Sequence, residues 1–124
     1  MRISPERFDQ LAFEIAEAVL AALPADLRAE AETVILDLVD QATLEQTGER
    51  GGTLLGLYEG VPLIARHADS LVLYPDRITL FRRPLQGLAR TEVELRRQIR
   101  KTLVHELGHF FGFEEDELEQ RGWA

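Results

Sequence analysis

The chain has 124 residues, of which 45% are hydrophobic and 29% charged, and its formal net charge is −8. This size and composition predict one globular domain, residues 1–124, with a single modest core. The acidic balance argues against nucleic acid or an anionic membrane as a partner, because both bind proteins through excess positive charge. Cysteine is absent, which excludes disulfides and thiolate metal sites.

The N-terminal segment predicts a helix rather than a targeting signal. Apolar residues recur at helical spacing from about Pro5 to Leu23, directly after Ser4, a preferred N-cap residue. Glu14 and Glu17 interrupt the apolar run, so neither a signal peptide nor a membrane span is expected. The cytoplasm is therefore the default location.

Four short runs of apolar and β-branched residues predict strands. They are Thr33–Val39, Thr53–Tyr58, Leu71–Tyr74 and Ile78–Phe81. The last two flank the turn sequence YPDR, so they are expected to form a hairpin. Gly56 within the second run indicates a bulge or a close backbone approach. The sequence RRPLQGLA, residues 82–89, reads as a connecting loop.

A second long helix is expected to begin after Thr91. Thr91 and Glu94 have the spacing of a capping box, in which each side chain bonds to the backbone amide of the other residue. The helix is expected to end near Phe111, with Gly112 as its left-handed C-cap, and a short helix from about Glu114 to Arg121 should follow. The order of helix, strands and helices predicts an α+β fold.

The second long helix contains the sequence HELGH, from His105 to His109. Residues four apart lie on one face of a helix, so both imidazoles can bind the same metal ion. Zinc accepts neutral imidazole nitrogen at about 2.0–2.1 Å. Glu106 points about 100° around the helix from His105, so it is not a third ligand. It can instead act as the general base of an H-E-x-x-H site, beside a water whose pKa zinc lowers.

An alternative is that the two histidines lie on the polar face of an ordinary amphipathic helix. The expected apolar stripe of this helix consists of Ile99, Leu103, Leu107 and Phe110. At 100° per residue, His105 and His109 fall well away from this stripe. They are therefore not expected in the core, and they face either solvent or a cleft.

A third ligand is expected after Gly112. The sequence continues the motif as H-E-x-x-H-x-x-G-x-x-E, where a glycine turn brings a later residue to the metal. Glu115 occupies that last position with Asp116 beside it, and carboxylate oxygen is an acceptable zinc ligand at about 2.0–2.2 Å. The alternative is that the acids form the solvated first turn of the last helix. This interpretation is preferred for Glu114, Glu117 and Glu119, whereas metal binding is preferred for Glu115 or Asp116. His67 is a further alternative as third ligand, and it requires a loop to fold over the helix.

Two other features stay open at the level of sequence. Tyr58, Tyr74 and Arg66 have the chemistry to stabilise an oxyanion, but their spacing selects none of them. The stretch TLLGLYEG, residues 53–60, is either an edge strand that pairs with an extended peptide or an ordinary core strand.

The chain resembles the small bacterial zincin-like metallopeptidases. The resemblance rests on LLGLYEGVPL (Leu54–Leu63), PDRITLFRRPL (Pro75–Leu85) and TLVHELGHFFGFEEDELEQRGW (Thr102–Trp123), and more weakly on the first helix. It implies a compact zincin-like α+β domain, with a small mixed sheet packed on the motif helix and the N-terminal helix. It also implies zinc at His105 and His109, with Glu106 as base. Members of the family have acidic residues after the glycine, as Glu115 and Asp116 are here.

The sequence thus predicts a zinc-dependent metallopeptidase that acts on a peptide or protein substrate. A zinc-bound water activated by Glu106 would attack the peptide carbonyl. The alternative is a catalytically weak zinc-binding module of zincin fold that acts through protein partners. A hydrolase of another substrate class and a metal-free structural domain are further alternatives. About twelve residues follow Gly112, so substrate binding is expected to be shallow or to be completed by another chain. The sequence gives no oligomeric state.

Overall fold

The computed structural model describes residues 1–48, 54–63 and 75–120. In chain order its elements are α1 (Pro5–Ala22), α2 (Ala25–Ala31), β1 (Ile35–Val39), α3 (Leu44–Thr47), β2 (Gly56–Glu59), β3 (Arg77–Phe81), α4 (Arg82–Gly87), α5 (Glu92–Phe111) and α6 (Glu115–Gln120). The expected α+β class is confirmed. Among the described residues, no helix is both long enough and apolar enough to cross a membrane.

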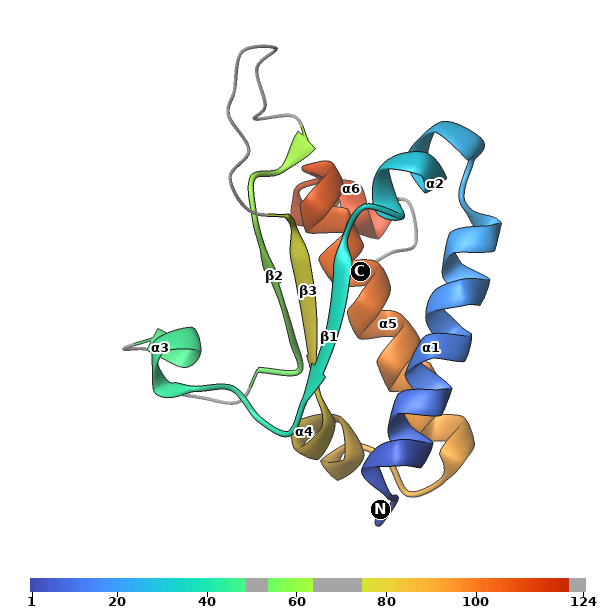
Figure 1. Ribbon diagram of the computed structural model, residues 1–124, viewed down its shortest axis with the longest axis vertical. Helices are drawn as coiled ribbons and strands as arrows, with labels where there is room; N and C mark the ends of the chain where they lie inside the picture. Colours follow the sequence, from blue (N-terminus) through green and yellow to red (C-terminus); the bar gives the residue numbers. More distant parts are fainter. Residues whose placement is uncertain (49–53, 64–74, 121–124) are drawn as a thin grey trace.

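The described strands form a small mixed sheet in the order β1-β3-β2. The central strand β3 runs parallel to β1, with Leu36 opposite Ile78, and antiparallel to β2, with Gly56 opposite Leu80. Figure 1 shows α1 and α5 side by side on one face of this sheet, with β2 at the edge of the three strands. The sheet and the two long helices therefore form two layers.

The core lies between these layers and is built from both long helices. Leu95, Ile99 and Leu103 of α5 are buried together with Phe8 and Leu11 of α1 and with residues of the central strand. The stripe of apolar residues expected on the motif helix is thus the stripe that is buried. Burial of apolar side chains supplies most of the free energy that favours folding, so α5 is fixed mainly by its apolar face.

Both long helices begin at capped ends. Ser4 accepts a hydrogen bond from the amide of Arg7 at 3.1 Å, and Thr91 accepts one from the amide of Glu94 at 3.2 Å. The return bond expected of the Thr91–Glu94 capping box was wrong by one residue, because the Glu94 carboxylate accepts from the amide of Arg90 at 2.6 Å and not from that of Thr91. The helix still begins where its cap predicted.

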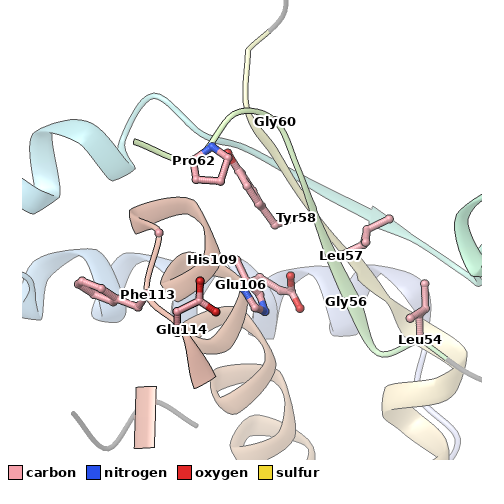
Figure 2. A pocket seen from close by; sticks show the side chains of 11 residues that line it. Leu54, Gly56, Leu57, Tyr58, Gly60, Pro62, Glu106, His109, Phe113 and Glu114 are labelled. Carbon is pink, nitrogen blue, oxygen red and sulfur yellow. The ribbon is translucent and has the colours of Figure 1, made fainter. Parts of the chain in front are cut away.

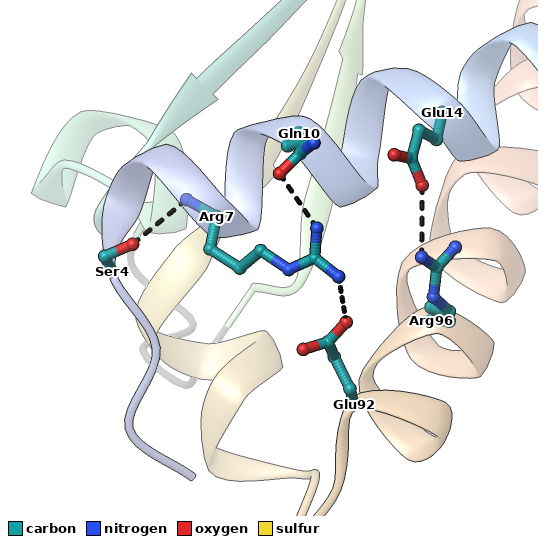
Figure 3. A network of polar contacts seen from close by, with 6 residues as sticks. All are labelled: Ser4, Arg7, Gln10, Glu14, Glu92 and Arg96. Atoms are coloured by element: carbon teal, nitrogen blue, oxygen red, sulfur yellow. Dashed lines mark hydrogen bonds and ion pairs between the residues drawn. The ribbon is translucent and has the colours of Figure 1, made fainter.

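Ion pairs join α1 to α5 along their exposed sides (Figure 3). Arg7 bonds to Glu92 and to Gln10, and Arg96 bonds to Glu14 at 3.1 Å. The hydrogen bond to Glu92 raises the pKa of Arg7, and the same bond lowers the pKa of Glu92. These side chains are well exposed, so the pairs orient the two helices more than they stabilise them.

A more buried ion pair joins α1 to the first residue of α4, directly after β3. The Arg82 side chain is only 15% exposed and makes two hydrogen bonds to Asp9, at 2.8 and 2.9 Å. It also bonds to Asp40 at 3.1 Å. The bonds to Asp9 are the main cause of the raised pKa of Arg82. A planar guanidinium with two parallel bonds to one carboxylate is among the stronger polar contacts in proteins.

The segment that follows β3 was expected to be a loop, and this prediction was wrong. Residues Arg82–Gly87 form α4, and Leu85 within it is fully buried. Proline suggested a loop, but Pro84 lies in the first turn of the helix, where its missing amide hydrogen breaks no hydrogen bond. The buried Leu85 and the Arg82 ion pair supply tertiary contacts that local sequence does not reveal.

The strand boundaries also differ from those expected. The first strand begins at Ile35 rather than at Thr33, because the amide and hydroxyl of Thr33 both bond to the carbonyl of Glu30 after the unforeseen helix α2. The second strand begins at Gly56. The third predicted strand, Leu71–Tyr74, lies outside the described residues, so the hairpin expected between it and Ile78–Phe81 remains untested. The fourth run forms β3 and pairs with both β1 and β2.

Of the two alternatives indicated at Gly56, a bulge or a close backbone approach, the structure shows the close approach, which lies between β2 and α5. A Cβ atom placed on Gly56 would lie 2.6 Å from Cγ2 of Thr102 and 3.2 Å from the carbonyl oxygen of Thr79. Thr102 is itself buried on α5. The absence of a side chain at Gly56 therefore allows the backbone of β2 to lie against the helix.

Gly56→Ala should destabilise the protein, because the new methyl group overlaps Thr102 and forces β2 away from α5. The expected cost is about 1–3 kcal/mol, visible as a melting temperature several degrees lower in thermal unfolding. Gly87→Ala is the matched control, since a Cβ atom there meets nothing within 4 Å. It should leave stability unchanged or slightly raised. Equal melting temperatures for the two variants would contradict this account of the β2–α5 contact.

Candidate metal centre

Helix α5 brings three side chains with metal-binding chemistry together. His105, Glu106 and His109 each offer an atom that lies within 4.8 Å of the atoms offered by the other two. The two Nε2 atoms of the histidines are 3.1 Å apart. Their rings meet edge to face, with centroids 4.7 Å apart and planes at 81°. All three side chains are partly buried.

The donor set fits a zinc ion. Two nitrogens that each lie about 2.0–2.1 Å from a tetrahedral zinc ion are separated by about 3.3 Å. The observed separation of 3.1 Å is close to that value. The same distance suits a hydrogen bond in which one ring donates and the other accepts, so the pair is compatible with the metal-free protein as well. Neither state requires the helix to change shape.

The face of α5 that carries this cluster is turned toward β2. Thr102, Glu106 and His109 follow one another at intervals of four and three residues, so they share a stripe of the helix. Thr102 packs against Gly56 at the start of this stripe. The same rotation of the helix points Glu106 and His109 toward this strand. The sequence had left solvent or a cleft as alternatives for His105 and His109. His109 lines a pocket together with Glu106, whereas His105 is partly buried and is not among the residues that line this pocket.

The pocket between β2 and α5 has a volume of about 570 Å³. It is lined by Leu54, Gly56, Leu57, Tyr58, Gly60, Pro62, Glu106, His109, Gly112, Phe113 and Glu114. Figure 2 shows Leu54, Gly56 and Leu57 to one side of Glu106 and His109, with Phe113 and Glu114 to the other. Its lining combines apolar residues with a few polar groups, which is typical of ligand-binding pockets.

The turn after α5 supplies the wall opposite β2. Gly112 has φ 89° and ψ 20°, the left-handed conformation expected of a C-cap glycine. Its amide donates to the carbonyl of His109 at 3.0 Å, and the amide of Phe113 donates to the carbonyl of Gly108 at 2.9 Å. These two bonds form a Schellman motif, which reverses the chain. The reversal places Phe113 and Glu114 at the pocket.

The acidic residues after this turn are placed differently from one another. Glu114, expected on a solvated face, is exposed but also lines the pocket. Glu115 begins α6, and its side chain lies outside the described part of the structure. Asp116 is exposed and is not among the residues that line the pocket. The assignment of the third ligand to Glu115 or Asp116 therefore stays a prediction. His67, Arg66 and Tyr74 lie outside the described residues.

Tyr58 is the member of the possible oxyanion-stabilising set that the structure places at the pocket. Its hydroxyl donates to Oδ1 of Asp76 at 2.7 Å. Its ring meets the ring of Phe110 edge to face, with centroids 6.0 Å apart. Sequence reasoning treated Asp76 only as a turn residue and did not connect it with the site. The sequence holds no local signal for this contact, because the two residues are far apart along the chain.

The family comparison agrees with this geometry. The sequence model of the zincin-like metallopeptidase family matches residues 29–123. The match includes β2, α5 and every residue that lines the pocket, and it begins after α1. No curated protein matches the chain. Since the matched residues cover most of the sequence and contain the His-Glu-His cluster, the chain belongs to the zincin-like metallopeptidase family.

Proposed function

We propose that this protein is a zinc-dependent metallopeptidase that hydrolyses peptide bonds in an extended peptide or protein substrate. The observation that carries the proposal is the position of the cluster on α5. Two imidazole nitrogens lie 3.1 Å apart, and Glu106 lines a pocket together with His109. The pocket lies beside β2, at the edge of the described sheet. The family match supports the same class of reaction.

His105 and His109 would hold the metal, and an acid after Gly112 would complete the protein ligands. When bound, zinc supplies a Lewis acid that polarises the peptide carbonyl and lowers the pKa of a bound water. Glu115 and Asp116 are the proposed sources of the third ligand. Carboxylate and imidazole together form a donor set that zinc accepts in catalytic sites.

Glu106 is proposed to move the protons of the reaction. Its carboxylate takes a proton from the attacking water as the water oxygen bonds to the carbonyl carbon. It then gives that proton to the nitrogen of the leaving amine as the carbon–nitrogen bond breaks. The base must lie within hydrogen-bonding reach of the attacking water, and Glu106 belongs to the same compact cluster as the two histidines.

The substrate is proposed to lie in an extended conformation along β2. Among the described strands, β2 pairs with β3 on one side, and it carries Leu57 and Tyr58 into the lining of the pocket. A peptide added to a sheet edge gains main-chain hydrogen bonds, whereas pockets for its side chains provide selectivity. The proposal therefore depends on the interpretation of β2 as an edge strand that pairs with an extended peptide.

The purified protein should contain about one zinc ion per chain, measured by metal analysis after reconstitution. His105→Ala and His109→Ala should each abolish stoichiometric zinc, because one remaining imidazole cannot form the site. Removal of the metal with a chelator should lower the melting temperature, since a ligand at 100 times its Kd stabilises a fold by about 2.7 kcal/mol. Arg97→Ala, an exposed change on the same helix, is the control. A protein without zinc after reconstitution would overturn the proposal.

The third ligand should be found among the acids that follow Gly112. Either Glu115→Ala or Asp116→Ala should weaken zinc binding. The loss of a ligand should exceed the roughly 10–100-fold loss of affinity seen when a residue that only hydrogen-bonds to a ligand is removed. Zinc affinity is measured by competition with a chromophoric chelator. Glu114→Ala tests whether the acid that lines the pocket takes part. If all three variants keep the affinity and His67→Ala loses it, the third ligand is the histidine.

Glu106→Gln should keep zinc but lower kcat for hydrolysis of labelled casein by about 10²–10⁴-fold, the usual contribution of a general base. Glutamine has the size of glutamate but cannot accept the proton. Glu119→Gln, an exposed acid on α6, should leave the rate unchanged. Unchanged activity in Glu106→Gln would refute the mechanism. Zinc binding without any hydrolysis in the unaltered protein would favour the zinc-binding module instead.

A further inference from the structure

We propose that Asp76 is a positioning residue that fixes the wall of the pocket formed by Tyr58 and the segment Gly60–Pro62. Tyr58, Gly60 and Pro62 all line the pocket that contains Glu106 and His109. The proposal rests on the proposed function for its catalytic meaning, because this wall is where an extended substrate would lie. Its structural basis is independent of any bound metal.

Asp76 connects all three described strands at one end of the sheet. It directly precedes β3 and is 5% exposed. Its carbonyl oxygen accepts from the amide of Ile35, the first residue of β1, at 2.9 Å. Its carboxylate oxygen Oδ1 accepts from the hydroxyl of Tyr58 on β2, at 2.7 Å. The same oxygen accepts from the amide of Val61, at 3.2 Å. A buried carboxylate with such bonds is costly to move, because its charge would lose its partners.

Gly60 is required for this arrangement. A Cβ atom on Gly60 would lie 2.0 Å from Oδ1 of Asp76 and 2.8 Å from the hydroxyl oxygen of Tyr58. Any side chain at this position would therefore displace the carboxylate from the two groups that it accepts from. The contact between Asp76 and β2 depends on glycine at position 60 as well as on the two hydrogen bonds.

The bond to Asp76 also decides what Tyr58 presents to the pocket. A tyrosine hydroxyl has one hydrogen to donate, and in this structure it is donated to the carboxylate. Tyr58 therefore acts as a wall rather than as the donor to an oxyanion. Its ring meets Phe110, the residue after His109, so the contacts run from Asp76 through Tyr58 to the motif helix. Asp76 in this way couples the end of β2 to the position of the candidate metal site.

The placement of this wall matters because hydrolysis depends on geometry. A substrate displaced by about 1 Å from a catalytic group reacts on the order of a hundred times more slowly. A peptide along β2 would take its position from β2 itself, whereas the metal takes its position from α5. Asp76 fixes the position of β2 relative to α5, and it does so without contacting the reacting atoms.

The test compares two ligands of the zinc-loaded protein in the variants Asp76→Ala and Tyr58→Phe. Acetohydroxamate chelates the metal alone, whereas a dileucine hydroxamate chelates it and also occupies the pocket. Asp76→Ala should weaken binding of the dileucine compound by about tenfold, because the wall of the pocket loses the two hydrogen bonds that hold it in place. The affinity for acetohydroxamate and for zinc should not change. Tyr58→Phe should act in the same direction with a smaller effect.

Hydrogen exchange provides a second readout that needs neither metal nor activity. The amide of Val61 should exchange faster by at least about tenfold in Asp76→Ala, because it loses its acceptor. Asp37→Ala is the matched control: Asp37 lies in the same sheet, is well exposed, and pairs with Arg77 at 3.8 Å. It should alter neither the exchange at Val61 nor the ratio of the two hydroxamate affinities. If Asp76→Ala does not fold, Tyr58→Phe carries the test.

An unchanged exchange rate at Val61 in Asp76→Ala would overturn the proposal. Faster exchange with an unchanged ratio of the two hydroxamate affinities would overturn it as well, because Asp76 would then have a purely structural role. Equal weakening of both hydroxamates would also overturn it, because the effect would then reach the metal. Failure of the proposed function looks different. It would appear in the unaltered protein as absence of zinc or of hydrolysis, while exchange at Val61 would still report on Asp76.

Discussion

The close contact between the backbone of β2 and helix α5 is the constraint on which the site depends. Gly56 has no side chain, so β2 can approach to within reach of Thr102. Burial of its apolar face fixes most of the rotation of α5 about its axis, and the contact at Thr102 turns the stripe that also contains Glu106 and His109 toward β2. The adjoining apolar stripe of the same helix is buried in the core. Glu106 and His109 consequently line the pocket instead of facing open solvent.

Local sequence rules predicted the helix and its motif well, for a physical reason. The cap at Thr91, the C-cap at Gly112 and the spacing of His105 and His109 are all properties of residues within one or two turns. Helix geometry converts such spacing directly into position. Even the close approach at Gly56 was expected, because glycine within a strand has few other uses. The sequence did not indicate which segment of the chain would lie against Gly56.

The features that sequence reasoning missed depend on contacts between distant residues. Asp76 lies in a stretch that has turn chemistry, yet it bonds to Tyr58, 18 residues away. Residues Arg82–Gly87 have the composition of a loop, yet burial of Leu85 and the ion pair from Arg82 to Asp9 make them a helix. In both cases a tertiary contact overrides a weak local preference. The pocket likewise comes from segments that adjoin only in the fold.

The spacing of the ligands also bears on the order in which the site assembles. His105 and His109 are four residues apart on one helix, whereas Gly56 and Thr102 are separated by 46 positions along the chain (102 − 56). Local contacts form early and at low entropic cost, but distant ones require the closure of a long loop. We therefore expect a partly folded chain with an intact α5 to retain some affinity for metal. Binding of the proposed peptide substrate, in contrast, would begin only when the sheet has docked on the helix.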